Sequence, residues 1–297
     1  MTQPVWLSAH VFRHDDLDEL LLTQIAPLMR ELVADGLVLG FFFLRHWEGG
    51  LHVRLRMRTD PADADKVGEL VTNRLGAYLR AHPSRHPANP ADYPRLAAEL
   101  AALEGNPGYE RRLFPPDTIR FIPYQPEHRS FGDGPSLAAV ERHFCESTAV
   151  ALDTLTTPPP QRVSPAMAMT LAALLCLPAN ADIMSYEFKP NDEAEAATKA
   201  AWLRSRDELT ALAERLRTAD TSTESRIPAL AWLRSFRELR DRLGGLCHEG
   251  RFVTESKHPL THALDRCLHL HLNRLGIPLP QEARLRRLAL YTLRHLP

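Results

Sequence analysis

Long apolar runs are missing from the 297-residue chain, and none approaches the roughly 18 residues that a membrane-spanning helix needs. The N-terminus has no basic segment followed by an apolar one, so we expect no secretory signal peptide. Cysteines are few and scattered, at positions Cys145, Cys176, Cys247 and Cys267. Their spacing excludes a zinc-binding motif or a disulfide framework and is typical of a reducing cytosol. We therefore expect a cytoplasmic protein that is not bound to a membrane.

Net charge is also nearly absent. The 36 Lys and Arg side chains are balanced by 37 Asp and Glu side chains, which argues against a general nucleic-acid binder. The chain lacks a glycine-rich phosphate loop, a metal-ligand spacing and a Gly-x-Ser-x-Gly nucleophile motif. We therefore expect no metal ion, no cofactor and no directly bound nucleic acid.

The most informative stretch lies at residues 41–58. An almost wholly apolar strand is followed by the turn Glu48-Gly49-Gly50 and by a strand that alternates strictly. One face of the second strand is polar: His52, Arg54, Arg56 and Arg58. These side chains, about 7 Å apart, form either a site that holds an anion or an ordinary solvated face. A row of like charges is costly unless something negative is opposite.

The N-terminal part has the pattern of a mixed fold. Strands are predicted over 5–12, 41–46, 51–58 and 117–124, and helices over 15–32, with a kink at Pro27, and 61–79. This order is that of a ferredoxin-like βαββαβ arrangement. An irregular insertion at about 82–116 contains one helix, 94–103. We assign residues 1–134 to this half.

Residues 135–297 form the second half, and their apolar spacing predicts helices throughout. The predicted helices cover 137–152, 165–177, 193–216, 230–243, 259–275 and 281–296, with a polar linker at 219–226. The fold class is therefore α+β, with an all-helical C-terminal half. We expect the two halves to form one compact unit.

Two further segments carry polar groups suited to chemistry. Glu127 follows the last predicted strand, with Arg129 nearby, and is either an acid/base group with an anion clamp or part of an ordinary turn. His269 and His271 lie on the helix at 259–275. Residues two apart diverge by about 200° on a helix, so they are a poor metal pair. Either histidine is a general acid or base, or a hydrogen-bonded core residue.

Four motifs occur in a characteristic order along nearly the whole chain. They are Gly49-Gly-Leu-His52-Val-Arg54-Leu-Arg56, Tyr124-x-x-Glu127, Glu141-x-x-Phe144-x-x-Ser147 and Leu268-His269-Leu-His271-Leu-Asn273-Arg274-Leu. Together they resemble the elimination domain of class I lantibiotic dehydratases, also called the thiopeptide-type bacteriocin biosynthesis domain. The strand motif and the last helix motif are fairly specific as a pair.

The resemblance implies an enzyme that modifies a ribosomally made precursor peptide. Because the family's long glutamyl-transfer domain is not in the sequence, we expect a stand-alone member, closest in kind to thiopeptide pyridine synthases. Such an enzyme joins two dehydroalanines in a formal aza-[4+2] cycloaddition, with loss of water and the leader peptide. The alternatives are the glutamate-eliminating lyase of a split dehydratase and a non-catalytic peptide-binding scaffold.

The resemblance also implies roles for individual residues. The family's elimination residues fall on Arg54, Arg56, Glu127 and His269, and Tyr124 joins them as a catalytic candidate. The family loop Tyr-x-x-Glu-x-x-Arg-Tyr-Gly-Gly is altered here, because Ser130 and Phe131 stand where Arg and Tyr are expected and Arg129 is one position early. This displacement favours pyridine formation over glutamate elimination.

The remaining candidates are substrate contacts. They are His52, Arg58, Arg129, Ser130, His271, Asn273 and Arg274. The partner implied is a precursor peptide with a leader and a dehydrated core. A homodimer, or association with other biosynthetic enzymes, is left open.

Overall fold

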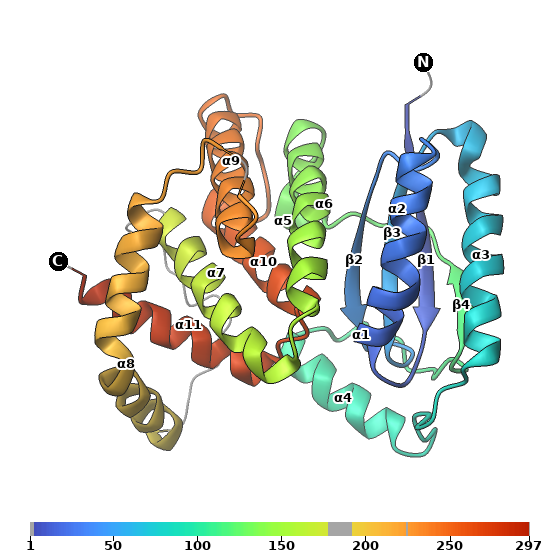
Figure 1. Ribbon diagram of the computed structural model, residues 1–297, viewed down its shortest axis with the longest axis horizontal. Coiled ribbons are helices and arrows are strands. Elements are labelled where there is room, and N and C mark those ends of the chain that lie inside the picture. Colours follow the sequence, from blue (N-terminus) through green and yellow to red (C-terminus); the bar gives the residue numbers. More distant parts are fainter. Residues whose placement is uncertain (1–2, 178–191, 224, 297) are drawn as a thin grey trace. The chain divides into compact units, whose positions relative to one another are not determined.

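The structure is a computed structural model that describes residues 3–177, 192–223 and 225–296. The chain divides into two compact units, which we call the sheet unit, Met1–Gln125, and the helical unit, Pro126–Pro297 (Figure 1). From the sequence, the change from mixed to helical structure is predicted nine residues later, after residue 134.

The sheet unit contains one antiparallel sheet of four strands in the order β2-β3-β1-β4. Its strands are β1 (Val5–Phe12), β2 (Gly40–His46), β3 (His52–Thr59) and β4 (Thr118–Phe121). All four were predicted, although β4 is shorter than expected. Pro123 has no N–H to donate to a ladder, which limits the strand there. An α+β architecture, with the sheet first and helices after it, is confirmed.

The predicted hairpin between β2 and β3 is present. Gly49 and Gly50 have φ angles of +77° and +109°, a region that residues with a Cβ rarely adopt. The Gly50 N–H donates to the Trp47 carbonyl over 2.9 Å and closes the turn. The turn fixes the register in which His46 faces His52.

Replacing Gly49 by alanine should destabilise the sheet unit. A Cβ at this position would lie 2.4 Å from Cδ2 of Phe114. The left-handed backbone costs about 1–2 kcal/mol for alanine, and the overlap adds about 1–3 kcal/mol. The matched control is Gly36→Ala, since Gly36 has a φ of +73° but no atom within 4 Å of the added Cβ. If chemical denaturation shows that both variants lose the same free energy of unfolding, the packing part of this prediction is wrong.

Helices cover the apolar face of the sheet. They are α1 (Leu17–Leu20), α2 (Ala26–Ala34) and α3 (Ala64–Ala81). A further helix, α4 (Tyr93–Glu104), lies within the predicted insertion and meets the hairpin turn, where the Tyr93 hydroxyl accepts from the Gly49 N–H. A π-helical turn, Leu21–Ile25, separates α1 from α2 and ends two residues before Pro27, where a kink was predicted. A Cβ on Gly68 of α3 would lie 3.9 Å from Leu7 of β1 and from Phe121 at the end of β4, which places α3 against this face.

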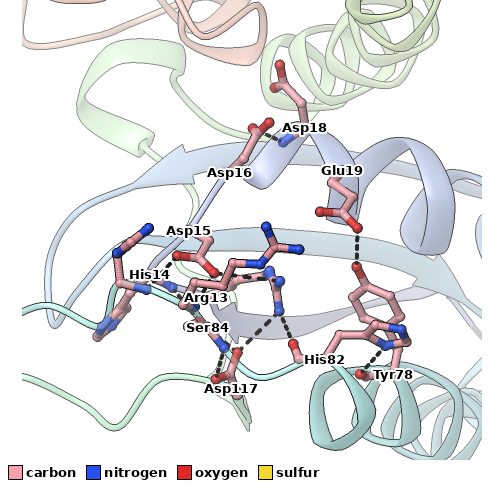
Figure 2. A network of polar contacts seen from close by, with 12 residues as sticks. Arg13, His14, Asp15, Asp16, Asp18, Glu19, Tyr78, His82, Ser84 and Asp117 are labelled. Atoms are coloured by element: carbon pink, nitrogen blue, oxygen red, sulfur yellow. Dashed lines mark hydrogen bonds and ion pairs between the residues drawn. The ribbon is translucent and has the colours of Figure 1, made fainter.

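A polar network anchors the loop that follows α3 (Figure 2). Asp117, whose φ is +58°, accepts from the Ser84 N–H at 2.7 Å and from the Ser84 hydroxyl at 2.8 Å. Arg13 lies 3.4 Å from the same carboxylate and donates to the His82 carbonyl at 2.6 Å. The carboxylate of Asp15 accepts two further backbone N–H groups from the loop. The loop is therefore tied to the end of the inner strand β1 and to the residue that precedes the edge strand β4.

The described residues of the helical unit fold mainly into α-helices. They are α5 (His128–Phe131), α6 (Pro135–Leu155), α7 (Val163–Cys176), α8 (Asp192–Thr218), α9 (Pro228–His248), α10 (Pro259–Arg274) and α11 (Leu279–Arg294). The six predicted helices of this half are confirmed, and proline occupies the first position of α6, α9 and α10, where its missing N–H costs nothing. Residue 224, within the predicted polar linker, lies outside the described residues. No helix in the described ranges is both long and apolar enough to cross a membrane.

Candidate active site

The second face of the sheet is polar and carries the arginine strand. The antiparallel register places each β3 side chain directly opposite one from β1, on the same face. The pairs are His52 with Phe12, Arg54 with His10, Arg56 with Ser8 and Arg58 with Trp6. Arg58, at the end of the row, is exposed, whereas His52 and Arg56 are buried. The face is therefore only partly solvated.

His52 holds Arg54 in place. Its Nδ1 lies 2.8 Å from the Gly50 carbonyl, and its Nε2 accepts from Nε of Arg54 over 3.4 Å. Burial lowers the pKa of His52 far below its usual value, so the ring is neutral and Nδ1 carries the proton. Arg54 also lies 3.6 Å from the carboxylate of Glu48. His52 and Glu48 thus act as positioning residues for the first arginine.

Arg56 has a different environment. It is 7% exposed, and among the described residues its Nη1 meets no hydrogen-bond acceptor. The guanidinium lies 5.5 Å from the centre of the Tyr124 ring, a cation–π distance. Burial and the charge of Arg54 lower the pKa of Arg56 to about 10, so it stays a cation at neutral pH. A buried cation with a spare donor is suited to binding a carbonyl or carboxylate oxygen.

Two residues of β1 on this face were not singled out from the sequence. Ser8 and His10 are 3% and 6% exposed, and the His10 ring stacks on His52 with 5.0 Å between ring centres. Burial, followed by the charges of Arg56 and Arg54, lowers the pKa of His10 to about 3. The signal was the alternation of β1, which places Trp6, Ser8, His10 and Phe12 on one side. A neutral imidazole therefore lies among the arginines.

In the helical unit, Glu127 is paired with a residue that was not predicted. It lies just before α5, and its carboxylate accepts from Nε and Nη2 of Arg266 on α10, at 2.9 and 3.2 Å. This two-pronged geometry fixes the carboxylate. Because Arg266 precedes His269 by three residues, the two share one side of α10. Glu127 is thereby anchored to the helix that carries His269.

The three loop residues with altered spacing differ in burial: Arg129 is exposed, Ser130 is half-buried and Phe131 is buried. Arg129 has a side chain that is 85% exposed and lies 3.3 Å from Glu255, which is also exposed. Ser130 has its hydroxyl 3.2 Å from Nε2 of His262 on α10. An exposed arginine in such a pair contributes little binding energy. In this structure Arg129 is therefore a solvated cation.

His269 belongs to a polar network between α10 and α11. Its Nδ1 lies 2.9 Å from Oε2 of Glu282, and the other oxygen of Glu282 accepts from Nε of Arg286 at 2.8 Å. Arg286 in turn contacts Asp265, one helical turn before His269. All four side chains are buried. Asp265 and His269 are i, i+4 neighbours on α10, as Glu282 and Arg286 are on α11, and a chain of hydrogen bonds joins the two helices.

This network fixes the tautomer of His269. Although burial opposes the charge on Glu282, the hydrogen bond and charge of His269 and the charge of Arg286 hold the pKa of Glu282 below its usual value. A carboxylate can only accept, so Nδ1 of His269 must donate to it. Nε2 is then the basic nitrogen of the neutral ring. The arrangement suits general acid–base chemistry.

The neighbouring motif residues point into the helical core. His271 is fully buried, with Nδ1 2.7 Å from the Ser147 hydroxyl and Nε2 2.9 Å from Sδ of Met169. Arg274 is also fully buried and lies 4.9 Å from the centre of the Phe144 ring. Asn273 is half-buried. We therefore attribute the roles of His271 and Arg274 to packing in the core of the helical unit.

The thiols offer no ready nucleophile. Burial raises the pKa of Cys267 well above its usual value, and burial also raises the pKa of Cys176. Within the described ranges, no group of three or more His, Cys, Asp or Glu side chains is arranged to hold a metal ion. The candidate chemistry thus rests on the arginines, Glu127 and His269.

Both units should lose stability on mild acidification. Burial lowers the pKa of His10 and of His143 to about 3 each, against about 6.5 in an unfolded chain. Between these values the unfolded state binds more protons than the folded state, so the free energy of unfolding falls as the pH drops. Each histidine contributes up to about 1.4 kcal/mol for every pH unit. Urea unfolding from about pH 7 to about pH 5 measures this slope. His143→Gln should make it shallower for the helical unit, and an unchanged slope would contradict the prediction.

A family model described as "Lantibiotic biosynthesis dehydratase C-term" matches residues 6–293. The chain belongs to this family. The match covers both units and includes all the candidate residues. No curated protein matches the chain.

Solved structures share the fold of this lantibiotic dehydratase C-terminal domain. A pyridine synthase, TbtD, from thiomuracin biosynthesis superposes with a TM-score of 0.77 at 22% identity, covering 97% of each chain. TsrL matches with a TM-score of 0.69 at 19% identity, covering 98% of this chain and 95% of TsrL. The tRNA-dependent lantibiotic dehydratase MibB from Microbispora sp. 107891 matches with a TM-score of 0.55 at 17% identity. That match covers 98% of this chain but 29% of MibB.

The predicted recognition of the family is therefore confirmed, and the chain is a dehydratase C-terminal domain similar in extent to TbtD and TsrL. Within it, the residues expected from the family fall in two groups. Arg54 and Arg56 lie in the sheet unit, and Glu127 and His269 lie in the helical unit. Each pair has its own supporting residues.

Proposed function

We propose that this protein is a stand-alone peptide-modifying enzyme that forms a thiopeptide pyridine ring by a formal aza-[4+2] cycloaddition. The substrate is a precursor peptide that bears a leader and two dehydroalanines. The observation that carries the proposal is the contact between His269 and Glu282, a buried histidine oriented by a carboxylate. The likeness to TbtD along the whole chain supports it at the level of the fold. The strand order β2-β3-β1-β4 supports a ferredoxin-like description of the sheet unit.

His269 supplies the proton transfer that the reaction needs first. One dehydroalanine bears the leader and the other, farther along the peptide, supplies the diene. The amide before this diene dehydroalanine must become its iminol, which moves a proton from nitrogen to oxygen and creates a 2-azadiene. Nε2 of His269 takes the amide proton, and Glu282 stabilises the imidazolium through Nδ1. In each of the two eliminations that follow, the same histidine carries a proton from the ring to the leaving oxygen or nitrogen. Glu127, fixed by Arg266, assists the loss of water.

The arginines supply charge stabilisation. Negative charge develops on an oxygen of the substrate during the reaction, and fixed cationic donors stabilise it most when they need no reorganisation. Arg56 offers a buried Nη1 donor, and Arg54 is held by His52 and Glu48. Addition of the leader-bearing dehydroalanine to the 2-azadiene then forms two carbon–carbon bonds. Water leaves from the former carbonyl carbon and the leader leaves as an amide, which makes the ring aromatic.

Glutamate elimination is the second candidate. The cationic face of β3 favours it, because a glutamyl carboxylate is an anion that Arg54 and Arg56 could bind. The position of Arg129 supports the cycloaddition instead. The family resemblance ties the loop arginine to glutamate expulsion, and here the nearest arginine is exposed and paired with Glu255.

Replacing Arg129 by alanine should leave turnover of a dehydroalanine peptide within about twofold of the unmodified enzyme, since exposed ion pairs contribute little. Mass-spectrometric rates provide the measurement, with Glu255→Ala as the matched control for loss of the ion pair alone. A drop of about a hundredfold in Arg129→Ala, with Glu255→Ala unaffected, would assign Arg129 to the chemistry and favour elimination.

The proposal is tested by mass spectrometry of the purified protein with two synthetic substrates. One is a leader-bearing peptide with two dehydroalanines, and the other is a glutamylated peptide. Loss of water together with the intact leader from the first substrate is the expected result. Release of glutamic acid from the second, with the first unchanged, would replace the cycloaddition by the elimination. Binding of the peptide without any mass change would indicate a scaffold.

A further inference from the structure

The polar face of the sheet contains a cluster of three buried groups with unused hydrogen-bonding capacity. They are the Ser8 hydroxyl, Nε2 of His10 and Nη1 of Arg56. Each side chain is more than nine-tenths buried, and none of the three atoms meets a partner among the residues that the structure describes. Buried polar groups are rarely left unpaired, because each costs about 1–3 kcal/mol. Three together therefore indicate a place built to receive a polar group.

The three groups are neighbours in the sheet. Ser8 lies directly opposite Arg56 in the β1–β3 register, and His10 is two residues further along β1 on the same face. Paired side chains in such a register have Cβ atoms about 5 Å apart, and those two residues apart on one strand are about 7 Å apart. Of the charges acting on His10, that of Arg56 is the strongest. A single small group can thus contact all three.

The chemistry of the cluster defines what it binds. Arg56 can only donate, and a serine hydroxyl or a neutral imidazole N–H can donate as well. His10 stays neutral because burial and the adjacent arginines oppose its protonation. No carboxylate contacts these atoms within the described residues. The complementary group is therefore an oxygen acceptor.

We propose that Ser8, His10 and Arg56 form a three-donor pocket for one oxygen of the substrate peptide, an amide carbonyl or a carboxylate. This inference rests on the proposed function and extends it. Ser8 and His10 become substrate-binding residues, and together with Arg56 they bind the oxygen on which charge develops. In the cycloaddition that oxygen is an amide carbonyl oxygen of the dehydroalanine peptide. In the elimination it is a glutamyl carboxylate oxygen.

The test uses Ser8→Ala and His10→Phe in the full chain, each of which removes one donor. Loss of one such donor should lower both kcat and kcat/KM about a hundredfold or more. The melting temperature should stay constant or rise, because an unpaired buried polar group is removed. Turnover of the dehydroalanine peptide against the glutamylated peptide distinguishes the carbonyl from the carboxylate.

The matched control is Thr59→Val at the end of β3. Thr59 is fully buried but donates to the Leu37 carbonyl at 2.8 Å, so its loss should lower the melting temperature and leave kcat unchanged. If Ser8→Ala and His10→Phe behave like Thr59→Val, the pocket is structural and the inference is wrong. If their melting temperatures rise while kcat is unchanged, the groups bind water only, and the inference is again wrong.

A separate measurement keeps this inference distinct from the proposed function. If the unmodified enzyme converts neither peptide, the proposed function fails, but the pocket can still be tested. The ¹⁵N resonance of His10 Nε2, assigned by its loss in His10→Phe, is followed with N-methylacetamide and with acetate. A saturable shift with either probe supports a pocket for a carbonyl or a carboxylate oxygen. No shift with either probe up to its solubility limit overturns it.

Discussion

Replacement of His269 by asparagine is expected to lower kcat by about 10²–10⁴, the usual contribution of general acid–base catalysis. Asparagine retains an N–H near the position of Nδ1, so Glu282 keeps a donor and the buried network is disturbed little. It cannot exchange a proton through a second nitrogen. Peptide affinity should therefore stay within about threefold, and the loss should appear in kcat. Single-turnover mass spectrometry and fluorescence-based peptide binding measure the two quantities.

Two comparison variants make this prediction specific. Glu282→Gln keeps the volume but allows its amide to donate to Nδ1, which would move the proton of His269 to the wrong nitrogen and also lower kcat. His248→Asn changes an exposed histidine at the end of α9 and should leave kcat unaltered. Full activity of His269→Asn would remove His269 from the chemistry. If the melting temperature of His269→Asn falls together with its kcat, His269 has a structural role instead.

Replacement of Arg56 by methionine is expected to lower kcat/KM by about 10²–10³, the effect of removing one preorganised donor to a developing oxyanion. The free energy of unfolding, by contrast, should not fall. Arg56 is a nearly buried cation whose Nη1 has no acceptor among the described residues. Methionine matches its stem without a buried charge, so the free energy of unfolding should be unchanged or higher by about 1 kcal/mol.

Arg80→Met is the matched control for Arg56→Met. Arg80 lies in the last turn of α3 and is exposed. Its replacement should leave kcat/KM unchanged and alter the free energy of unfolding by no more than about 0.5 kcal/mol. If Arg56→Met instead unfolds the sheet unit, the guanidinium stabilises the fold through its contact with Tyr124. If Arg56→Met is both stable and fully active, the donor is not used.

The order of elements was predictable because it depends on local patterns. The alternation of residues 51–58 and the glycines of the turn at Glu48-Gly49-Gly50 determine a hairpin with one polar face, and the helical spacing after residue 135 is continuous. The start of the helical unit was less predictable. The irregular segment between β4 and α6 has no periodicity, and α5 within it has only four residues.

The partners within the site could not be predicted, because they come from different elements. Glu282 and Arg286 occupy α11, which has no unusual composition, and only its packing against α10 brings them to His269 and Asp265. The surroundings of the two buried histidines could not be predicted from the sequence either. His269 and His271 are adjacent in the same motif, yet one contacts a carboxylate and the other lies against Ser147 and Met169.

The most direct test of the cycloaddition is an isotope experiment with a substrate carrying ¹⁸O in the amide carbonyl before the diene dehydroalanine, the one that does not bear the leader. Pyridine formation removes that oxygen as water, since the carbonyl carbon becomes a ring atom. The proposed reaction therefore predicts a macrocyclic product without ¹⁸O and a released, intact leader amide. Retention of ¹⁸O in the only product, or release of glutamate from a glutamylated peptide as the only reaction, would contradict the proposed function.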